Sequence, residues 1–241
     1  MNTIEVLSYP LADITYDEVV FSIQKRLTEP GFTYIITLNP EILIRADQDP
    51  EVSAIIKNAF LCLADGSGLI LASRFLYKKA PSKITGMDLT TMLLEKGSFS
   101  FYLVGGHPDI LPKAVEVIAK DYSKSVIKGS QHGYFKPEEE AAIIADIQAK
   151  KPDIVLVGLG FPKQERFLKS LETQLTYGVG MGVGGVFDIL SGSKPRAPEI
   201  WQKLHVEWLY RGLIEPQRMK RWTFIPTFGV AVMKEWISGR R

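Results

Sequence analysis

Carboxylates stand where apolar segments of this sequence end. Asp65 directly follows the apolar residues 60–64 and precedes Gly66. At the rim of a sheet, partly shielded from water, such a carboxylate suits a general base that takes a proton from an attacking hydroxyl group. The same Asp-Gly pair could instead form a turn or cap the helix expected near Ser67. Asp188, after residues 184–187, is a second rim carboxylate and could bind a ribose hydroxyl group.

Glycines accompany these carboxylates at the ends of further apolar segments. A glycine lets the backbone approach a ligand closely, and the helix that follows directs free N–H groups at an anion. Pro162 suits a first helical turn, which would place Lys163 and Gln164 beside such a helix end. A diphosphate fits this rim, although each glycine alone could be an ordinary turn between strand and helix. The glycines expected at the diphosphate are Gly105, Gly106, Gly158, Gly160, Gly184 and Gly185.

Other nucleotide and metal motifs are weak or missing. The sequence has no G-x-x-x-x-G-K-[ST] motif, so a P-loop NTPase is not expected. Gly158-x-Gly160 lacks the third glycine of a dinucleotide fingerprint, and the glycine-rich residues 180–185 lack the acidic residue that should follow them. NAD binding therefore has little support. Asp47-Gln48-Asp49 resembles the D-x-D motif that holds a metal-bound nucleotide sugar in some transferases, but it precedes Pro50, where capping of a helix explains it better. The three histidines are scattered. We therefore expect no metal site and no cofactor.

The elements that must position these residues alternate along the chain. Continuous apolar runs at 33–38, 60–64, 100–104, 153–157 and 177–181, and a weaker one near 125–128, predict strands covered on both faces. Helix start signals lie between them: a Thr15–Glu18 capping box, Asp49 before Pro50, and acidic residues after Pro137. The pattern predicts an α/β fold with a doubly wound, mostly parallel, Rossmann-like sheet.

Composition is ordinary, but charge is unevenly distributed. The chain has 241 residues, 46% of them hydrophobic, and a net charge of +2. Residues 194–241 hold ten basic and four acidic residues, a net charge of +6, which leaves −4 for residues 1–193. We therefore expect a nucleotide-sugar-binding catalytic domain at 1–193 and a basic, Trp-rich helical appendage at 194–241. Cys62 is the single cysteine and is expected to be a small buried hydrophobic residue.

The appendage has the features of a segment that lies in an interface. Ile225, Phe228, Val232 and Trp236 fall near one face of a helix, flanked by basic residues, which favours docking on an anionic membrane surface. Packing on the body, or self-association into a homo-oligomer, is the alternative. The acidic body offers no continuous basic stripe, so nucleic acid is not an expected partner. The N-terminus has no signal peptide and no apolar run spans a bilayer, so we expect a cytoplasmic protein, peripherally associated with the inner face of the plasma membrane.

A series of short motifs, in order along the chain, resembles one family. The motifs are Thr37-x-Asn39, Ala64-Asp65-Gly66-x-Gly68, Gly86-Met87-Asp88-Leu89, Gly105-Gly106, His132-Gly133-Tyr134-Phe135, Gly158-x-Gly160-x-Pro162-Lys163-Gln164-Glu165, Gly182-x-Gly184-Gly185-x-Phe187-Asp188, Gly192, Arg196-Ala197-Pro198, Glu207-Trp208-x-Tyr210-Arg211 and Glu215-Pro216-x-Arg218-x-x-Arg221. Together they resemble the WecG/TagA/CpsF family of bacterial glycosyltransferases.

The resemblance implies an inverting, metal-independent transferase that uses a UDP-sugar donor. Its acceptor would be a polyprenyl-diphosphate-linked sugar, in the synthesis of wall teichoic acid or another surface polysaccharide. TagA-type members add N-acetylmannosamine to undecaprenyl-diphosphate-linked N-acetylglucosamine, whereas WecG-type members transfer N-acetylmannosaminuronic acid. The sequence leaves this choice open, because no residue can be assigned to the additional carboxylate of the uronic acid.

The resemblance also implies roles for individual residues. Asp65 would be the general base, and Thr37, Asn39 and Gln164 would line the sugar pocket. Lys83 stands where the family commonly has arginine; it keeps the charge but loses the bidentate geometry. The appendage arginines expected over the diphosphate are Arg211, Arg218 and Arg221.

Tyr134 offers a stacking surface for uracil, with a buried core tyrosine as the alternative.

Two other functions remain as alternatives for the whole chain. One is a nicotinamide-dependent oxidoreductase on the same sheet, and the other is a non-enzymatic membrane-binding module that depends on the appendage.

Overall fold

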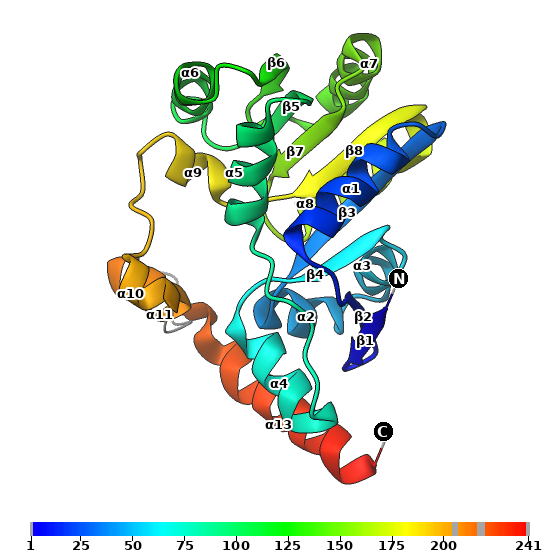
Figure 1. The fold of residues 1–241 in the computed structure, drawn as a ribbon, viewed down its shortest axis with the longest axis vertical. Helices are drawn as coiled ribbons and strands as arrows, with labels where there is room; N and C mark the ends of the chain where they lie inside the picture. Colours follow the sequence, from blue (N-terminus) through cyan, green and yellow to red (C-terminus); the bar gives the residue numbers. More distant parts are fainter. Residues whose placement is uncertain (1, 204–206, 216–219, 240–241) are drawn as a thin grey trace.

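The computed structural model describes residues 2–203, 207–215 and 220–239. Within them, a six-stranded sheet has the order β4-β3-β8-β7-β5-β6, and every neighbouring pair of strands is parallel (Figure 1). Its strands are β3 (Gly31–Leu38), β4 (Leu61–Ala64), β5 (Ser100–Gly105), β6 (Val126–Gln131), β7 (Ile154–Gly158) and β8 (Tyr177–Gly182). The predicted Rossmann-like class is confirmed, and the five main strands lie within two residues of their expected bounds.

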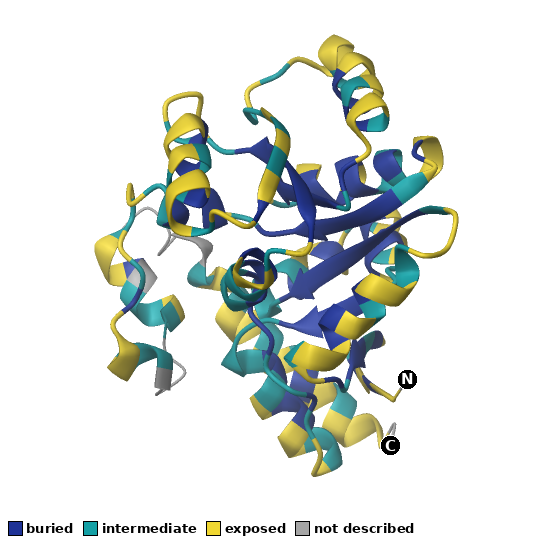
Figure 2. Ribbon diagram, turned by 45° about the horizontal axis from the view of Figure 1, so that its top comes forward, coloured by how far each residue is buried: buried dark blue, intermediate teal, exposed yellow. Residues whose placement is uncertain are grey.

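Helices cover both faces of this sheet, because alternate residues of each strand face opposite sides. Ile36 and Cys62 belong to one buried cluster, whereas Ile35 and Leu61 belong to the other. The first cluster is closed by α2 (Pro40–Ala46), α3 (Pro50–Lys57), α4 (Ser67–Tyr77), α7 (Glu140–Lys150) and α8 (Lys163–Gln174). The second is closed by α1 (Tyr16–Arg26), α5 (Gly86–Lys96), α6 (Leu111–Asp121) and α9 (Val186–Leu190). In Figure 2 the strands form the buried centre between these layers.

Several helices begin at the residues that the sequence indicates. Thr15 and Glu18 form the predicted capping box of α1, and Asp49 caps α3 by accepting a hydrogen bond from the Val52 amide at 3.2 Å. A short 3-10 helix, η1 (Pro137–Glu139), precedes α7. The expectation that Pro162 lies within the first turn of α8 was wrong by one position, because the helix begins at Lys163 with Pro162 as its N-cap.

An N-terminal hairpin was not predicted. Strands β1 (Thr3–Val6) and β2 (Tyr9–Ala12) pair antiparallel and contact α4 and β4. Each strand is four residues long and β2 contains Pro10, so neither gives a clear signal in the sequence.

The C-terminal part consists of α10 (Glu199–Lys203), α11 (Glu207–Ile214), the 3-10 helix η2 (Lys220–Thr223) and α13 (Phe224–Ser238). In Figure 1, α13 runs alongside α4, and its residues also contact α2. No helix among the described residues is long and apolar enough to cross a membrane.

The expected apolar face of α13 does not form a single exposed surface. Val232 is 8% exposed and belongs to the core, and Phe228 packs against that core, whereas Trp236 is 51% exposed. The prediction that these residues share one docking face was therefore wrong in part, because the middle of the helix packs on α2 and α4. The division of the chain at residue 193 stays a prediction.

Strands β5 and β7 approach each other so closely at their ends that a side chain at Gly105 should be destabilising. A Cβ atom at Gly105 would lie 2.3 Å from the Gly158 carbonyl oxygen, and the Gly105 φ of +129° disfavours any side chain. We expect Gly105→Ala to lower the free energy of unfolding by about 1–3 kcal/mol, measured by urea denaturation. Gly229→Ala is the matched control, because a Cβ atom there has open space within α13 and alanine favours a helix. Equal effects of the two substitutions would contradict this packing argument.

Candidate active site

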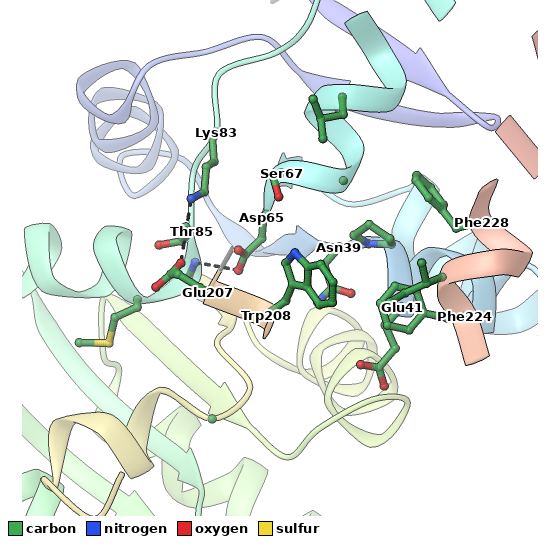
Figure 3. Close-up of a pocket in the computed structure, with 18 of the residues that line it drawn as sticks. Asn39, Glu41, Asp65, Ser67, Lys83, Thr85, Glu207, Trp208, Phe224 and Phe228 are labelled. Carbon is green, nitrogen blue, oxygen red and sulfur yellow. Dashed lines mark hydrogen bonds and ion pairs between the residues drawn. The ribbon is translucent and has the colours of Figure 1, made fainter. Parts of the chain in front are cut away.

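One pocket lies beyond the carboxyl ends of β3, β4 and β8, with a cavity of about 370 Å³ (Figure 3). One part of its wall is polar and comes mainly from the body: Asn39, Asp65, Ser67, Lys83, Thr85 and Glu207. The other part is apolar and comes from α4 and the C-terminal helices: Leu71, Trp208, Trp222, Phe224, Ile225 and Phe228. A concave site of this volume, with a few convergent polar groups, has the properties of a binding site for a small molecule.

Asp65 lies at the polar end because two backbone connections hold it there. Its amide donates to the Leu38 carbonyl oxygen at 2.7 Å, which ties the end of β4 to the end of β3. Its Oδ2 atom accepts a hydrogen bond from the Gly86 amide at 3.2 Å, at the N-terminus of α5. Both the amide and the positive end of the helix stabilise the charged carboxylate, which is the form that can accept a proton.

Lys83 is brought beside Asp65 by a parallel bridge between Ala64 and Lys83, with the Ile84 amide donating to the Ala64 carbonyl oxygen at 2.9 Å. Its Nζ atom lies 4.0 Å from Oε2 of Glu207, which comes from α11. Figure 3 shows both residues close to Thr85 and Asp65. The sequence motif that contains Glu207 does not indicate this role, because no local pattern predicts that α11 reaches the pocket.

Asn39 and Thr37 occupy different places. Asn39 lines the pocket, and its Oδ1 atom caps α2 by accepting from the Ile42 amide at 2.9 Å. Thr37 is buried and its hydroxyl group donates to the Gly182 carbonyl oxygen at 3.0 Å. It lies directly behind the wall, because a Cβ atom at Gly86 would be 3.3 Å from Thr37 Oγ1 and 3.8 Å from Asp65 Oδ2. The structure therefore brings Thr37, Asp65 and Gly86 together.

Gln164 is buried and supports the loop after β8. Its Oε1 atom accepts from the Gly184 amide at 2.8 Å, and its Nε2 atom donates to Glu165 Oε1 at 3.2 Å. Glu165 therefore fixes the orientation of the Gln164 amide, and Gln164 in turn fixes the loop that brings Gly185 to the pocket wall. Glu165 is fully buried, and its Oε2 atom has no hydrogen-bond partner among the described residues.

The remaining rim glycines pack closely at the ends of β5 and β7. The Gly106 amide donates to the Gly158 carbonyl oxygen at 3.2 Å, and a Cβ atom at Gly158 would lie 2.7 Å from the Gly184 carbonyl oxygen. The amides of Gly106 and Gly184 thus already have protein partners, whereas open space surrounds a Cβ atom placed at Gly160. The predicted diphosphate contacts of these glycines stay predictions.

An exposed aromatic pair, His107 and Tyr134, follows Gly106 and Gly133, which are joined by a hydrogen bond from the Gly133 amide to the Gly106 carbonyl oxygen at 2.9 Å. Tyr134 is 68% exposed, so it is not the core tyrosine that was the alternative. The Tyr134 and His107 rings form a T-shaped pair with centroids 5.1 Å apart, and the Tyr134 amide donates to His132 Nδ1 at 3.2 Å. This contact of His107 was not predicted from the sequence.

Asp188 faces a cation of the protein. It lies 2.8 Å from Lys194 Nζ, which is also 3.1 Å from Glu215 Oε2. Its role in binding ribose stays a prediction. Arg218 and the side chains of Arg211 and Arg221 lie outside the described residues, so their roles at the diphosphate stay predictions too. Within the described ranges, no three His, Cys, Asp or Glu residues group as metal ligands do.

In open parallel sheets, ligands bind beyond the carboxyl ends of the strands, which is where this pocket and Asp65 lie. The chain matches the model of the glycosyl transferase WecG/TagA/CpsF family over residues 4–241, and it belongs to this family. It is therefore a glycosyltransferase, and the resemblance seen in the motifs is confirmed.

The chain is also similar to a named enzyme of Bacillus spizizenii, the N-acetylglucosaminyldiphosphoundecaprenol N-acetyl-beta-D-mannosaminyltransferase. The two are 36% identical over 204 residues, which cover 83% of this chain and 79% of the relative.

The buried Glu165 predicts a pH-dependent stability. Burial raises the pKa of Glu165 above its usual value of 4.5. The folded protein therefore holds the proton of the Glu165 carboxyl group more tightly than the unfolded chain does. Relative to Glu165→Gln, the wild type should be most stable below pH 4.5 and should lose that advantage as the pH rises through the raised pKa. Urea denaturation at a series of pH values measures this difference, with the exposed Glu138→Gln as the control. A difference that does not change with pH would contradict the prediction.

Proposed function

We propose that this enzyme transfers N-acetylmannosamine from a UDP-sugar to a polyprenyl-diphosphate-linked N-acetylglucosamine. The observation that carries the proposal is the position of Asp65, at the polar end of a pocket whose other end is apolar. The acceptor has the same division, a sugar diphosphate joined to a hydrocarbon chain. The relative's name favours N-acetylmannosamine over its uronic acid, and it fits a role in wall teichoic acid or other surface polysaccharide synthesis.

In the proposed reaction, Asp65 takes the proton of the attacking hydroxyl group of the acceptor sugar. The hydroxyl oxygen forms a bond to the anomeric carbon of the donor, while the bond from that carbon to the UDP oxygen breaks on the opposite face. The configuration at the anomeric carbon is therefore inverted. The Gly86 amide keeps Asp65 charged before the proton arrives, and Asn39 and Lys83 lie where they can orient the two sugars.

The leaving UDP needs compensation for its negative charge. We propose that Lys83, Gly185 and the appendage residues Arg211, Arg218 and Arg221 supply it, without a metal ion. The uracil would stack on Tyr134, over the glycine cluster at the ends of β5 and β7. This places the donor along the rim, from the aromatic pair towards Asp65.

The proposed location is the inner face of the cytoplasmic membrane, where the lipid-linked acceptor would be met. Residues 194–241 would act as an appendage that approaches the membrane, since their net charge of +6 attracts anionic lipids. The exposed apolar residues of α13 that could enter the interface are Ile225, Val230, Met233, Trp236 and Ile237.

The role of Asp65 predicts a specific kinetic effect. We expect Asp65→Asn to lower kcat by about 10²–10⁴-fold, because asparagine keeps the hydrogen bond from Gly86 but cannot take a proton. Affinity for UDP should change less than twofold. Acceptor-dependent UDP release measures turnover, and Asp17→Asn on the exposed surface of α1 is the matched control. Full activity of Asp65→Asn would exclude Asp65 as the base.

The role of Tyr134 predicts an effect on binding alone. We expect Tyr134→Leu to raise the Kd for UDP about tenfold, because stacking of a base on an aromatic ring contributes about 1–3 kcal/mol. The Kd for inorganic diphosphate should not change, since that ligand has no base. Isothermal titration calorimetry measures both values, and an unchanged Kd for UDP would place the uracil elsewhere.

A further inference from the structure

The apolar end of the pocket continues out of the cavity along two helices. Gly68 and Leu71 of α4 and Phe224 and Phe228 of α13 line the pocket, so both helices begin there. At their far ends Tyr77 hydrogen bonds to Glu235. The two helices therefore run in the same direction away from Asp65, as Figure 1 shows for α4 and α13.

Apolar side chains follow the seam between these helices, and we call them the apolar strip: Leu71, Phe75, Ile225, Phe228 and Trp236. Leu71 is 62% exposed and Phe75 is 44% exposed, one helical turn further along α4. The Phe75 and Trp236 rings meet with their centroids 5.9 Å apart. From Ile225 to Trp236 the strip extends for about 16 Å, at 1.5 Å per residue.

Four of the five strip residues are not needed to close the core, and only Phe228 packs against it. Val232 fills that role from the buried side of α13, whereas four of the five strip residues are exposed and Phe228 is half-buried. A continuous apolar surface of this kind on a folded protein marks a binding surface. This one opens directly into the pocket that contains Asp65.

We propose that the apolar strip binds the first isoprene units of the acceptor's polyprenyl chain. The inference rests on the proposed acceptor class, whose chain is joined covalently to the diphosphate and must leave the pocket beside it. Figure 3 shows Trp208 between Asp65 and the phenylalanines of α13, so a chain that leaves the polar end meets aromatic and aliphatic side chains at once. The strip makes the body helix α4 part of lipid recognition, beyond the C-terminal appendage.

Contact with a bilayer alone explains the strip less well. Such contact requires an exposed apolar surface but no connection to a catalytic cavity, and Leu71 belongs to both the cavity wall and the strip. Three exposed basic residues lie towards the far ends of the same helices: Arg74 of α4, Lys78 directly after α4, and Lys234 of α13. A chain guided along the strip would therefore reach the bilayer where cationic side chains can meet anionic headgroups.

Binding of diphosphates with increasing chain length, without membranes or detergent, tests the inference. The full chain is titrated by calorimetry with isopentenyl, geranyl and farnesyl diphosphate, which carry one, two and three isoprene units. We expect the Kd to fall at least tenfold from the shortest to the longest. Leu71→Ser should weaken binding of both longer ligands about fivefold or more, and Phe75→Ser should do so for farnesyl diphosphate only.

Phe21→Ser is the matched control, because Phe21 is 68% exposed on α1, outside the strip. It should leave all three Kd values unchanged. Equal Kd values for the three ligands, no binding of any of them, or equal losses in Phe21→Ser would overturn the inference. Since no sugar is transferred in this titration, its failure would leave the proposed role of Asp65 intact. Conversely, an inactive enzyme that still shows the chain-length dependence would overturn only the proposed transfer.

Discussion

The site depends on the connection between the end of β4 and the segment that leads into α5. The Ile84 amide donates to the Ala64 carbonyl oxygen, and the Gly86 amide donates to the Asp65 carboxylate. These two hydrogen bonds bring Lys83 and the positive end of α5 to a carboxylate that the parallel sheet has already placed at its rim. A charged carboxylate in a half-closed pocket would be costly without such donors, so the fold supplies the stabilisation together with the position.

A second set of contacts fixes the other side of the pocket. Gln164 and Glu165 do not line the pocket themselves. They fix the loop after β8, which forms part of the pocket wall. The glycines at the ends of β5 and β7 act in a similar way, since they allow the backbones there to approach each other closely. Residues that resemble ligand contacts in the sequence can thus be the supports that place such contacts.

The sequence predicts the sheet well because buried parallel strands are continuous apolar runs, and it predicts Asp65 because the residue ends such a run. It does not predict the pair of Lys83 with Glu207, since these residues are distant in the chain and no local pattern relates them. The apolar side of α13 shows a similar limit. Phe228, Val232 and Trp236 follow one another at intervals of four residues, as expected for one side of a helix. Only tertiary packing decides that Val232 enters the core while Trp236 remains exposed.

Three carboxylates line the pocket, Asp65, Glu41 and Glu207, and the central claim is that Asp65 acts as a base in a single displacement. A carboxylate that instead attacked the sugar would form a covalent intermediate, and the two displacements would retain the configuration of the donor. The most direct test is the anomeric configuration of the disaccharide product, determined by NMR on material made from a UDP-sugar of known configuration. We expect inversion at the transferred sugar. Retention would contradict this expectation and would assign one of the three carboxylates as a nucleophile.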